Sequence, residues 1–277
     1  MRIGYDGTDF SGWATQPGRR TVQETIETTL STVLRSPVRL TVAGRTDAGV
    51  HASGQVVHCD VPVDSLQSRS IDGDPSRLVR RLAKMLPDDV RVKAVEQVST
   101  DFDARFAALA RTYEYRLADA LWGAEPTSAR ITADWPRHLD VDLMNAASAS
   151  LVGLNDFAAF CRFREGSTTI RELQEFSWRR DDAGVLVARV RADAFCWSMV
   201  RSLVGAVAVV GDGRRDLDWC VGLLAERERS AQVPVAQARG LCLMRVDYPP
   251  ESEWAARSAL TRDVRDESEL RGGCCGD

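Results

Sequence analysis

The sequence predicts an α+β protein in which helices pack on a largely antiparallel sheet. Two observations carry this prediction. Helix-like and strand-like apolar patterns recur in both halves of the 277 residues. In the second half, two alternating runs at residues 172–180 and 185–192 flank the turn-forming segment 181–184, which is the pattern of an antiparallel hairpin. The length allows one or two domains with a sizeable core.

The first half is expected to begin with a helix over residues 21–35. Its apolar residues fall on one helical face, and Thr21 with Glu24 forms the pattern of a capping box. Strands are expected at residues 38–42, 55–61 and 90–97, and a flexible loop at residues 65–75. A second helix, capped by Ser76, should reach Met85. Its buried face is expected to contain Leu78, Leu82, Met85 and Leu86.

The second half adds the remaining elements of the body. Strands are expected at residues 111–117 and 241–248, beside the hairpin. Helices are expected from Asp140 to about Gly153, at 195–210 as a mostly buried helix, and at 216–227. The polar segment 251–277 is expected to be a disordered tail.

One carboxylate stands out in the loop between the strands expected at residues 38–42 and 55–61. Asp47 lies between Gly44 and Gly49, two residues after Arg45. A short glycine-bounded loop can present one side chain and let a ligand approach closely. Taken alone, a glycine-flanked aspartate more often indicates an ordinary turn. An ionised aspartate oriented by a guanidinium is, however, also what covalent catalysis by a carboxylate requires.

The longer string Ala43–Ala52, followed by Gly54–His58, resembles the catalytic-loop signature of the tRNA pseudouridine synthase A family. Further similar motifs occur in the family's order and extend the resemblance over residues 1 to about 250. They lie at residues 5–13, 21–24, 103–106, 111–116, 156–157, 194–201 and 240–249. The chain departs from the family in having Trp197 where many members carry a histidine.

The resemblance implies a fold and an activity. The fold would consist of two ferredoxin-like halves, residues 1–100 and 101–250, that form a largely antiparallel sheet with an active cleft between them. The activity would be isomerisation of uridine to pseudouridine at positions 38–40 of the tRNA anticodon arm. The family acts as a homodimer with RNA bridging both subunits, so tRNA and a second copy of the chain are the expected partners.

The resemblance also implies roles for individual residues. Asp47 would be the catalytic aspartate, and Arg45 would orient it. Tyr113 matches the family's active-site tyrosine, which can stack on an extruded base and serve in proton transfer. Arg201, expected on the same helical face as Trp197, would contact Asp47 or RNA phosphate. Arg105 is a weaker candidate for phosphate contact.

Other residues in these motifs favour structural roles. Tyr115 is interpreted as a core residue, although it shares a strand face with Tyr113. His51 and His58 are interpreted as hydrogen-bonded structural residues, and Trp13 as a core residue.

A basic stripe, formed by Arg77, Arg80, Arg81 and Lys84, follows one face of the helix expected before Met85. Four like charges at this spacing repel one another unless an anion is near. The stripe has two interpretations of equal weight. It contacts RNA phosphate, with Arg80 and Arg81 as the candidate residues, or it is simply a solvated helix face.

Composition narrows the chemistry. The reaction needs no redox change, and the sequence offers no metal or cofactor site, so no cofactor is expected. The seven scattered cysteines favour a reducing cytosol over a disulfide framework, and the longest apolar run is too short to span a membrane. A cytoplasmic protein is therefore expected. The net charge is −4, of which the segment 251–277 carries −3. RNA binding must therefore depend on where the arginines lie.

The sequence leaves two other functions open. A non-catalytic tRNA-binding or RNA-chaperone protein would share the fold, and the Trp197 substitution leaves room for it. A carboxylate glycosidase would need two acids a defined distance apart. No second acid stands out near Asp47, so this alternative ranks last.

Overall fold

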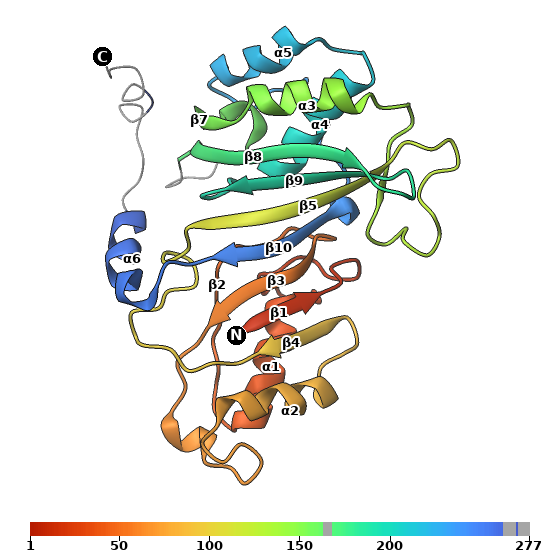
Figure 1. Cartoon of the computed structure of the whole chain (residues 1–277). Coiled ribbons are helices and arrows are strands. Elements are labelled where there is room, and N and C mark those ends of the chain that lie inside the picture. Colours follow the sequence, from red (N-terminus) through yellow and green to blue (C-terminus); the bar gives the residue numbers. More distant parts are fainter. Residues whose placement is uncertain (163–167, 263–269, 271–277) are drawn as a thin grey trace. The chain divides into compact units, whose positions relative to one another are not determined.

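The computed structural model describes residues 1–162, 168–262 and 270 and divides the chain into two compact units (Figure 1). Unit 1 contains residues 1–109 and 243–262. Unit 2 contains residues 110–242. Unit 1 is therefore built from two separate stretches of sequence, and the second stretch supplies most of its last strand.

Unit 1 is a β-sheet with two helices packed together beside it. Its strands are β1 (Arg2–Tyr5), β2 (Thr41–Val42), β3 (His51–His58), β4 (Val90–Ala94) and β10 (Leu241–Asp247). They follow the order β4-β1-β3-β10, and β2 pairs with β3. Helix α1 (Val22–Leu34) packs on α2 (Leu78–Met85), and α2 packs beside β4. Ile3, Ile26 and Leu82 are fully buried in this core.

The start of α1 differs from the expected capping box. Thr21 occupies the N-cap position, but its side chain forms no capping hydrogen bond, and its hydroxyl is buried without a partner among the described residues. The N–H groups of Val22 and Gln23 instead donate to the carbonyl oxygens of Gly12 and Trp13, at 3.2 and 3.0 Å. Backbone atoms of the preceding loop therefore satisfy the helix end.

The entry to α2 also differs from the expectation. Residues Pro75–Arg77 form a 3₁₀ turn, and Asp74, rather than Ser76, caps it by accepting from the Ser76 N–H. The expected loop at residues 65–75 includes the end of another 3₁₀ helix, Val63–Leu66. Met85 is 44% exposed, so its assignment to the buried face is wrong. The helix ends at Met85. Leu86, the next residue, has an extended backbone and is buried as expected.

A helix forms where the sequence suggested the beginning of a disordered tail. Helix α6 (Trp254–Arg262) packs through Trp254, whose ring lies 4.8 Å from that of Phe102. The Trp254 indole N–H donates to the Pro249 carbonyl at 3.0 Å. One aromatic anchor thus orders a segment that is otherwise mostly polar. The rest of the expected tail, residues 263–269 and 271–277, lies outside the described residues.

Unit 2 has an antiparallel sheet with three helices. Its strands are β5 (Ala110–Ala118), β6 (Ala133–Asp134), β7 (Gly153–Asp156), β8 (Ile170–Arg180) and β9 (Leu186–Ala192). They follow the order β5-β9-β8-β7, and the short β6 runs parallel to β5. Helix α3 (Val141–Ser150) packs on β8, on α4 (Met199–Gly211) and on α5 (Leu217–Gly222), as Figure 1 shows.

The α+β class predicted from the sequence is confirmed in both units. The β8–β9 hairpin and the Asp140 cap of α3 are also as expected. Several boundaries moved. The strand expected at 38–42 is reduced to Thr41–Val42, and α4 begins at Met199 rather than at residue 195. Ser198 has a φ of 71°, a left-handed conformation that a continuous helix cannot contain.

Candidate active site

The Asp47 loop, residues 43–50, joins β2 to β3 and is tied to the core of unit 1. The Thr46 side chain is buried, and its hydroxyl lies 2.7 Å from the hydroxyl of Tyr5. The Thr46 carbonyl accepts from the Trp13 N–H at 3.0 Å, and the Asp47 carbonyl accepts from the Val50 N–H at 3.1 Å. Asp47 itself is partly exposed. The fold therefore fixes the backbone on both sides of a carboxylate that remains accessible.

Two glycines allow neighbouring segments to approach this loop. A Cβ on Gly7 would overlap the carbonyl oxygen of Val50. Gly12 has a φ of +93°, and a Cβ there would lie 3.0 Å from the Thr46 carbonyl oxygen. The Gly7 N–H also donates to Nδ1 of the buried His51, at 3.1 Å. The structural interpretation of His51 is therefore confirmed, and Trp13, 1% exposed, is a core residue as expected.

A third support of the loop comes from Gln55 of β3. Its side-chain amide donates to the Gly44 carbonyl at 2.8 Å and to the Tyr5 hydroxyl at 3.3 Å. Gln55 and Tyr5 lie within the sequence motifs noted above. Their function in holding the loop could not be read from those motifs, because the two residues are 50 positions apart and meet only in the folded chain. Sequence reasoning missed both.

Arg45 is exposed, and no ion pair joins it to Asp47 in the part of the chain that the structure describes. The expected orienting pair is therefore not formed. Asp47 takes part in other interactions, and the hydrogen bonds of Thr46 and Val50 position its backbone. This places Arg45 where it can meet a ligand that reaches the loop.

Tyr113 lies in unit 2, on β5. Its side chain is 7% exposed, and its ring meets the ring of Phe195 edge-on, with centroids 5.2 Å apart and planes at 89°. Phe195 comes from the segment before α4 and was not singled out in the sequence as a partner for Tyr113. A T-shaped contact of this kind fixes the tilt of the tyrosine ring.

Tyr115, two residues along β5, has a structural function. It is fully buried, and its hydroxyl donates to the Gln237 carbonyl at 2.8 Å. Burial raises the pKa of this phenol well above its usual range. A buried, hydrogen-bonded tyrosine that stays protonated confirms the interpretation of Tyr115 as a core residue.

Arg201 lies in the first turn of α4 and is partly buried. Its Nε donates to the Ala236 carbonyl at 2.6 Å, while the Ala236 N–H donates to the Arg201 carbonyl at 3.0 Å. Trp197 lies outside the helix and is 50% exposed, so the expectation that the two share a helical face is wrong. The Arg162 guanidinium instead lies 5.1 Å from the centre of the Trp197 ring.

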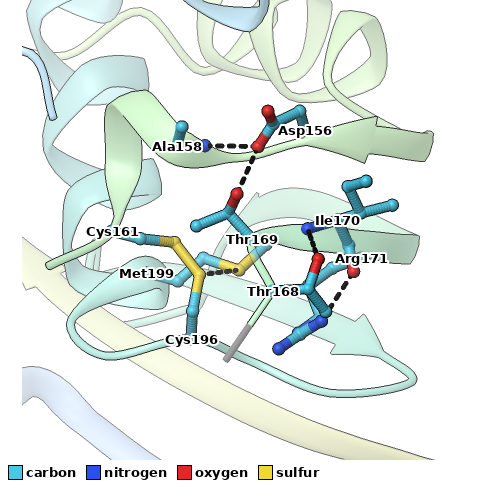
Figure 2. The surroundings of a disulfide bond; sticks show 9 residues. All are labelled: Asp156, Ala158, Cys161, Thr168, Thr169, Ile170, Arg171, Cys196 and Met199. Atoms are coloured by element: carbon cyan, nitrogen blue, oxygen red, sulfur yellow. Dashed lines mark hydrogen bonds between the residues drawn. A yellow bond between two sulfur atoms is a disulfide. The ribbon is translucent and has the colours of Figure 1, made fainter. Parts of the chain in front are cut away.

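A disulfide joins Cys161 to Cys196 just before α4, beside the sulfur of Met199 at 3.7 Å (Figure 2). It corrects the interpretation of the cysteines as scattered thiols. The two residues are 35 positions apart in sequence, and only the folding of unit 2 brings their Cα atoms to 5.8 Å. The bond links the residues that immediately precede Arg162 and Trp197.

The remaining candidate arginines lie in unit 1. Arg105 is exposed and lies 5.0 Å from the centre of the Phe106 ring. In the basic stripe, Arg77 pairs with Asp72 at 3.0 Å, and Arg81 donates to the Ser70 hydroxyl. Arg80 is exposed on α2 and forms no ion pair with a described residue. Part of the stripe is thus compensated within the protein, and Arg80 is not.

Within the described residues, no group of histidine, cysteine or acidic side chains could hold a metal ion. Over the same residues, the structure contains no helix with the length and apolar character needed to cross a bilayer.

Comparison with known proteins identifies the family of this chain. The family model described as tRNA pseudouridine synthase matches residues 2–107 and 147–249. Proteins named tRNA pseudouridine synthase A from Mycobacterium leprae and Corynebacterium glutamicum are each 52% identical, over 96% of this chain and 94% of theirs. The corresponding protein of Frankia casuarinae is 52% identical with the same coverage.

The chain therefore belongs to the tRNA pseudouridine synthase A family and is an isomerase. Among solved structures, a Cbf5–Nop10–Gar1 complex matches 89% of this chain and 58% of that chain, with 8% identity and a TM-score of 0.36.

Proposed function

We propose that the protein converts uridine to pseudouridine at positions 38–40 of the tRNA anticodon arm, with Asp47 as the catalytic aspartate. The observation that carries this proposal is the Asp47 loop. Its backbone is held by Tyr5, Trp13 and Gln55, while the carboxylate remains partly exposed. Rigid support around an accessible reacting group is what positioning catalysis requires.

The chemistry needs few groups. The bond between ribose C1′ and uracil N1 breaks, a bond between C1′ and C5 forms, and the C5 proton leaves while N1 gains one. A carboxylate can trap or stabilise the detached intermediate, and a base must take the C5 proton. We assign the first task to Asp47 and propose that the phenol of Tyr113 serves the second.

Arginines would hold the RNA. The target base must be extruded from a folded stem-loop, at a cost of a few kcal/mol, which phosphate contacts can offset. We propose Arg45, Arg201 and Arg105 for contacts near the target nucleotide, and Arg80 with Arg81 for more distant phosphates. Arg45 and Arg80 are suited to this because both are exposed and lack a carboxylate partner among the described residues.

We also propose that the protein works in the cytoplasm as a homodimer, with one tRNA contacting both subunits. Light scattering of the purified protein should give twice the mass of the 30.5 kDa chain. A monomeric mass at micromolar concentration would contradict the dimer without affecting the assignment of Asp47.

Tritium release from tRNA labelled at uridine C5 tests the chemical proposal. Asp47→Asn keeps the size of the side chain but removes its charge. It should bind tRNA with wild-type affinity and release no tritium. Full release by this variant would end the assignment of Asp47, and loss of tRNA binding would show that the residue acts in binding.

A further inference from the structure

Three arginines of unit 2 come from segments that backbone hydrogen bonds fasten together. The Ser230 N–H, next to Arg229, donates to the Ala159 carbonyl at 3.0 Å. The Arg162 N–H donates to the Trp197 carbonyl, also at 3.0 Å. The disulfide between the residues preceding Arg162 and Trp197 adds a covalent link. Arg201 lies in the first turn of α4, which follows Trp197.

Two of these three arginines have no carboxylate partner among the described residues. Burial, and then the positive charges of Arg162 and Arg201, lower the pKa of Arg229. The Nη1 atom of Arg229 is buried and has no hydrogen-bond acceptor among the described residues. Neither Arg162 nor Arg229 forms an ion pair with a described residue. By contrast Arg227, two positions before Arg229, pairs with Asp156 at 3.1 Å.

Clustered guanidinium groups without a counter-charge are unfavourable unless an anion joins them. An unpaired buried donor destabilises the fold, and like charges add repulsion. A phosphate offers several acceptor oxygens and negative charge, and the guanidinium fork matches its geometry. A phosphate that turns the Arg229 guanidinium toward itself would provide the missing acceptor.

Beside these arginines, the exposed ring of Trp197 is a second feature suited to binding RNA. Its ring is half exposed, and the Arg162 guanidinium lies over it at a distance typical of a cation–π contact. This contact restricts the direction of an otherwise flexible arginine. RNA-binding sites commonly combine arginine with an exposed aromatic ring.

We propose that Arg162, Arg201 and Arg229, the arginine cluster, bind a backbone phosphate of the tRNA substrate beside Trp197. The proposal rests on tRNA being the substrate. It adds Arg162, Arg229 and Trp197 to the residues that contact RNA. It also gives the tryptophan a function at the position where many family members carry a histidine.

Binding of a tRNA transcript at several salt concentrations tests the arginine cluster. Arg162→Glu and Arg229→Gln should each raise the Kd for tRNA about tenfold or more. Each should also reduce the slope of log K against log salt concentration by about one unit, the value for one phosphate contact. Arg229→Lys, which keeps the charge, should lose less. Arg179→Glu, an exposed arginine at the hairpin end of β8, is the matched control and should bind like wild type.

The result that overturns the proposal is binding by Arg162→Glu and Arg229→Gln equal to that of Arg179→Glu, with the same salt dependence. This outcome is distinct from failure of the proposed activity. A wild-type protein that binds tRNA but forms no pseudouridine would refute the activity, and the binding series would still decide whether the arginine cluster holds phosphate.

Thermal unfolding without tRNA separates ligand binding from a structural role. Removing the charge of Arg229 relieves repulsion and an unpaired buried donor, so Arg229→Gln should unfold at the wild-type temperature or above it. A clearly lower midpoint would show that Arg229 serves to hold the fold and would overturn its assignment to the arginine cluster.

Discussion

The Asp47 loop and the arginine cluster place polar groups in opposite ways. In the loop, buried hydrogen bonds to Tyr5, Trp13 and Gln55 hold the chain without any ligand. In the arginine cluster, Arg162 and Arg229 remain without carboxylate partners in the described part of the chain. The first region is organised by the protein alone, and the second is left for an anion to complete.

This difference matches what catalysis and binding each require. A reacting carboxylate acts from a fixed position, because a misplacement of about 1 Å can cost about 100-fold in rate. A phosphate site instead gains from charge that the fold has not already neutralised. Variants that disturb the held residues should therefore change turnover, and variants of uncompensated arginines should change affinity.

Apart from that of Asp47→Asn, the largest effect is expected at Tyr113. Tyr113→Phe removes the phenol that we assign to proton transfer and should lower turnover by about 10²–10⁴-fold, with little change in tRNA binding. Tyr115→Phe, on the same strand, is the control. It loses the hydrogen bond to Gln237 and should cost about 1 kcal/mol of stability while turnover stays near wild type. Equal losses of turnover in both variants would contradict the assignment.

Gly7→Ala tests whether close packing holds the Asp47 loop. The added methyl group overlaps the Val50 carbonyl, so the loop must shift. We expect a stability loss of about 1–3 kcal/mol and a fall in turnover of about 100-fold. Gly44→Ala is the matched control, because nothing lies within 4 Å of its added Cβ. Normal turnover by Gly7→Ala would show that the loop position is not critical.

A smaller effect is expected from the basic stripe. Arg80→Glu combined with Arg81→Glu should weaken tRNA binding about tenfold and flatten its salt dependence by about one unit per lost phosphate contact. Turnover at saturating tRNA should not change. The exposed pair Arg137→Glu and Arg179→Glu provides the same change of charge elsewhere. An unchanged salt slope in the stripe variant would restore the interpretation of a solvated helix face.

The smallest effect is expected at Tyr5. Tyr5→Phe removes the partner of the Thr46 hydroxyl and one of the two acceptors of the Gln55 amide, which still donates to the Gly44 carbonyl. Leaving the buried Thr46 hydroxyl unpaired should cost about 1–3 kcal/mol in stability, measured by urea unfolding. Turnover should fall only a few-fold, because the backbone bonds of Thr46 to Trp13 and of Asp47 to Val50 remain. A loss as large as that of Gly7→Ala would mean that the hydroxyl pair alone holds the loop.

Local patterns in the sequence were enough to predict the elements whose stability comes from near neighbours. The apolar face of α1, the Asp140 cap and the β8–β9 turn are examples, because each depends on residues within a few positions of one another. The string around Asp47 was also recognisable, since a motif is contiguous by definition.

Features that depend on distant contacts could not be predicted in this way. The cap of α1 uses carbonyls of Gly12 and Trp13, and α6 is ordered by Phe102, far away in the sequence. The Cys161–Cys196 bond and the arginine cluster likewise join residues that are far apart in the sequence. The charge pattern of α2 predicted the basic stripe. It could not show that Asp72 already neutralises Arg77.

A pseudouridine map of tRNA tests the central claim most directly. Cells that lack this protein would be supplied with the wild-type chain or with Asp47→Asn at equal protein levels. The account predicts that the wild type restores pseudouridine at positions 38–40 of the anticodon arm and that Asp47→Asn restores none. Restoration by the asparagine variant, or pseudouridine restored only at other positions, would contradict it.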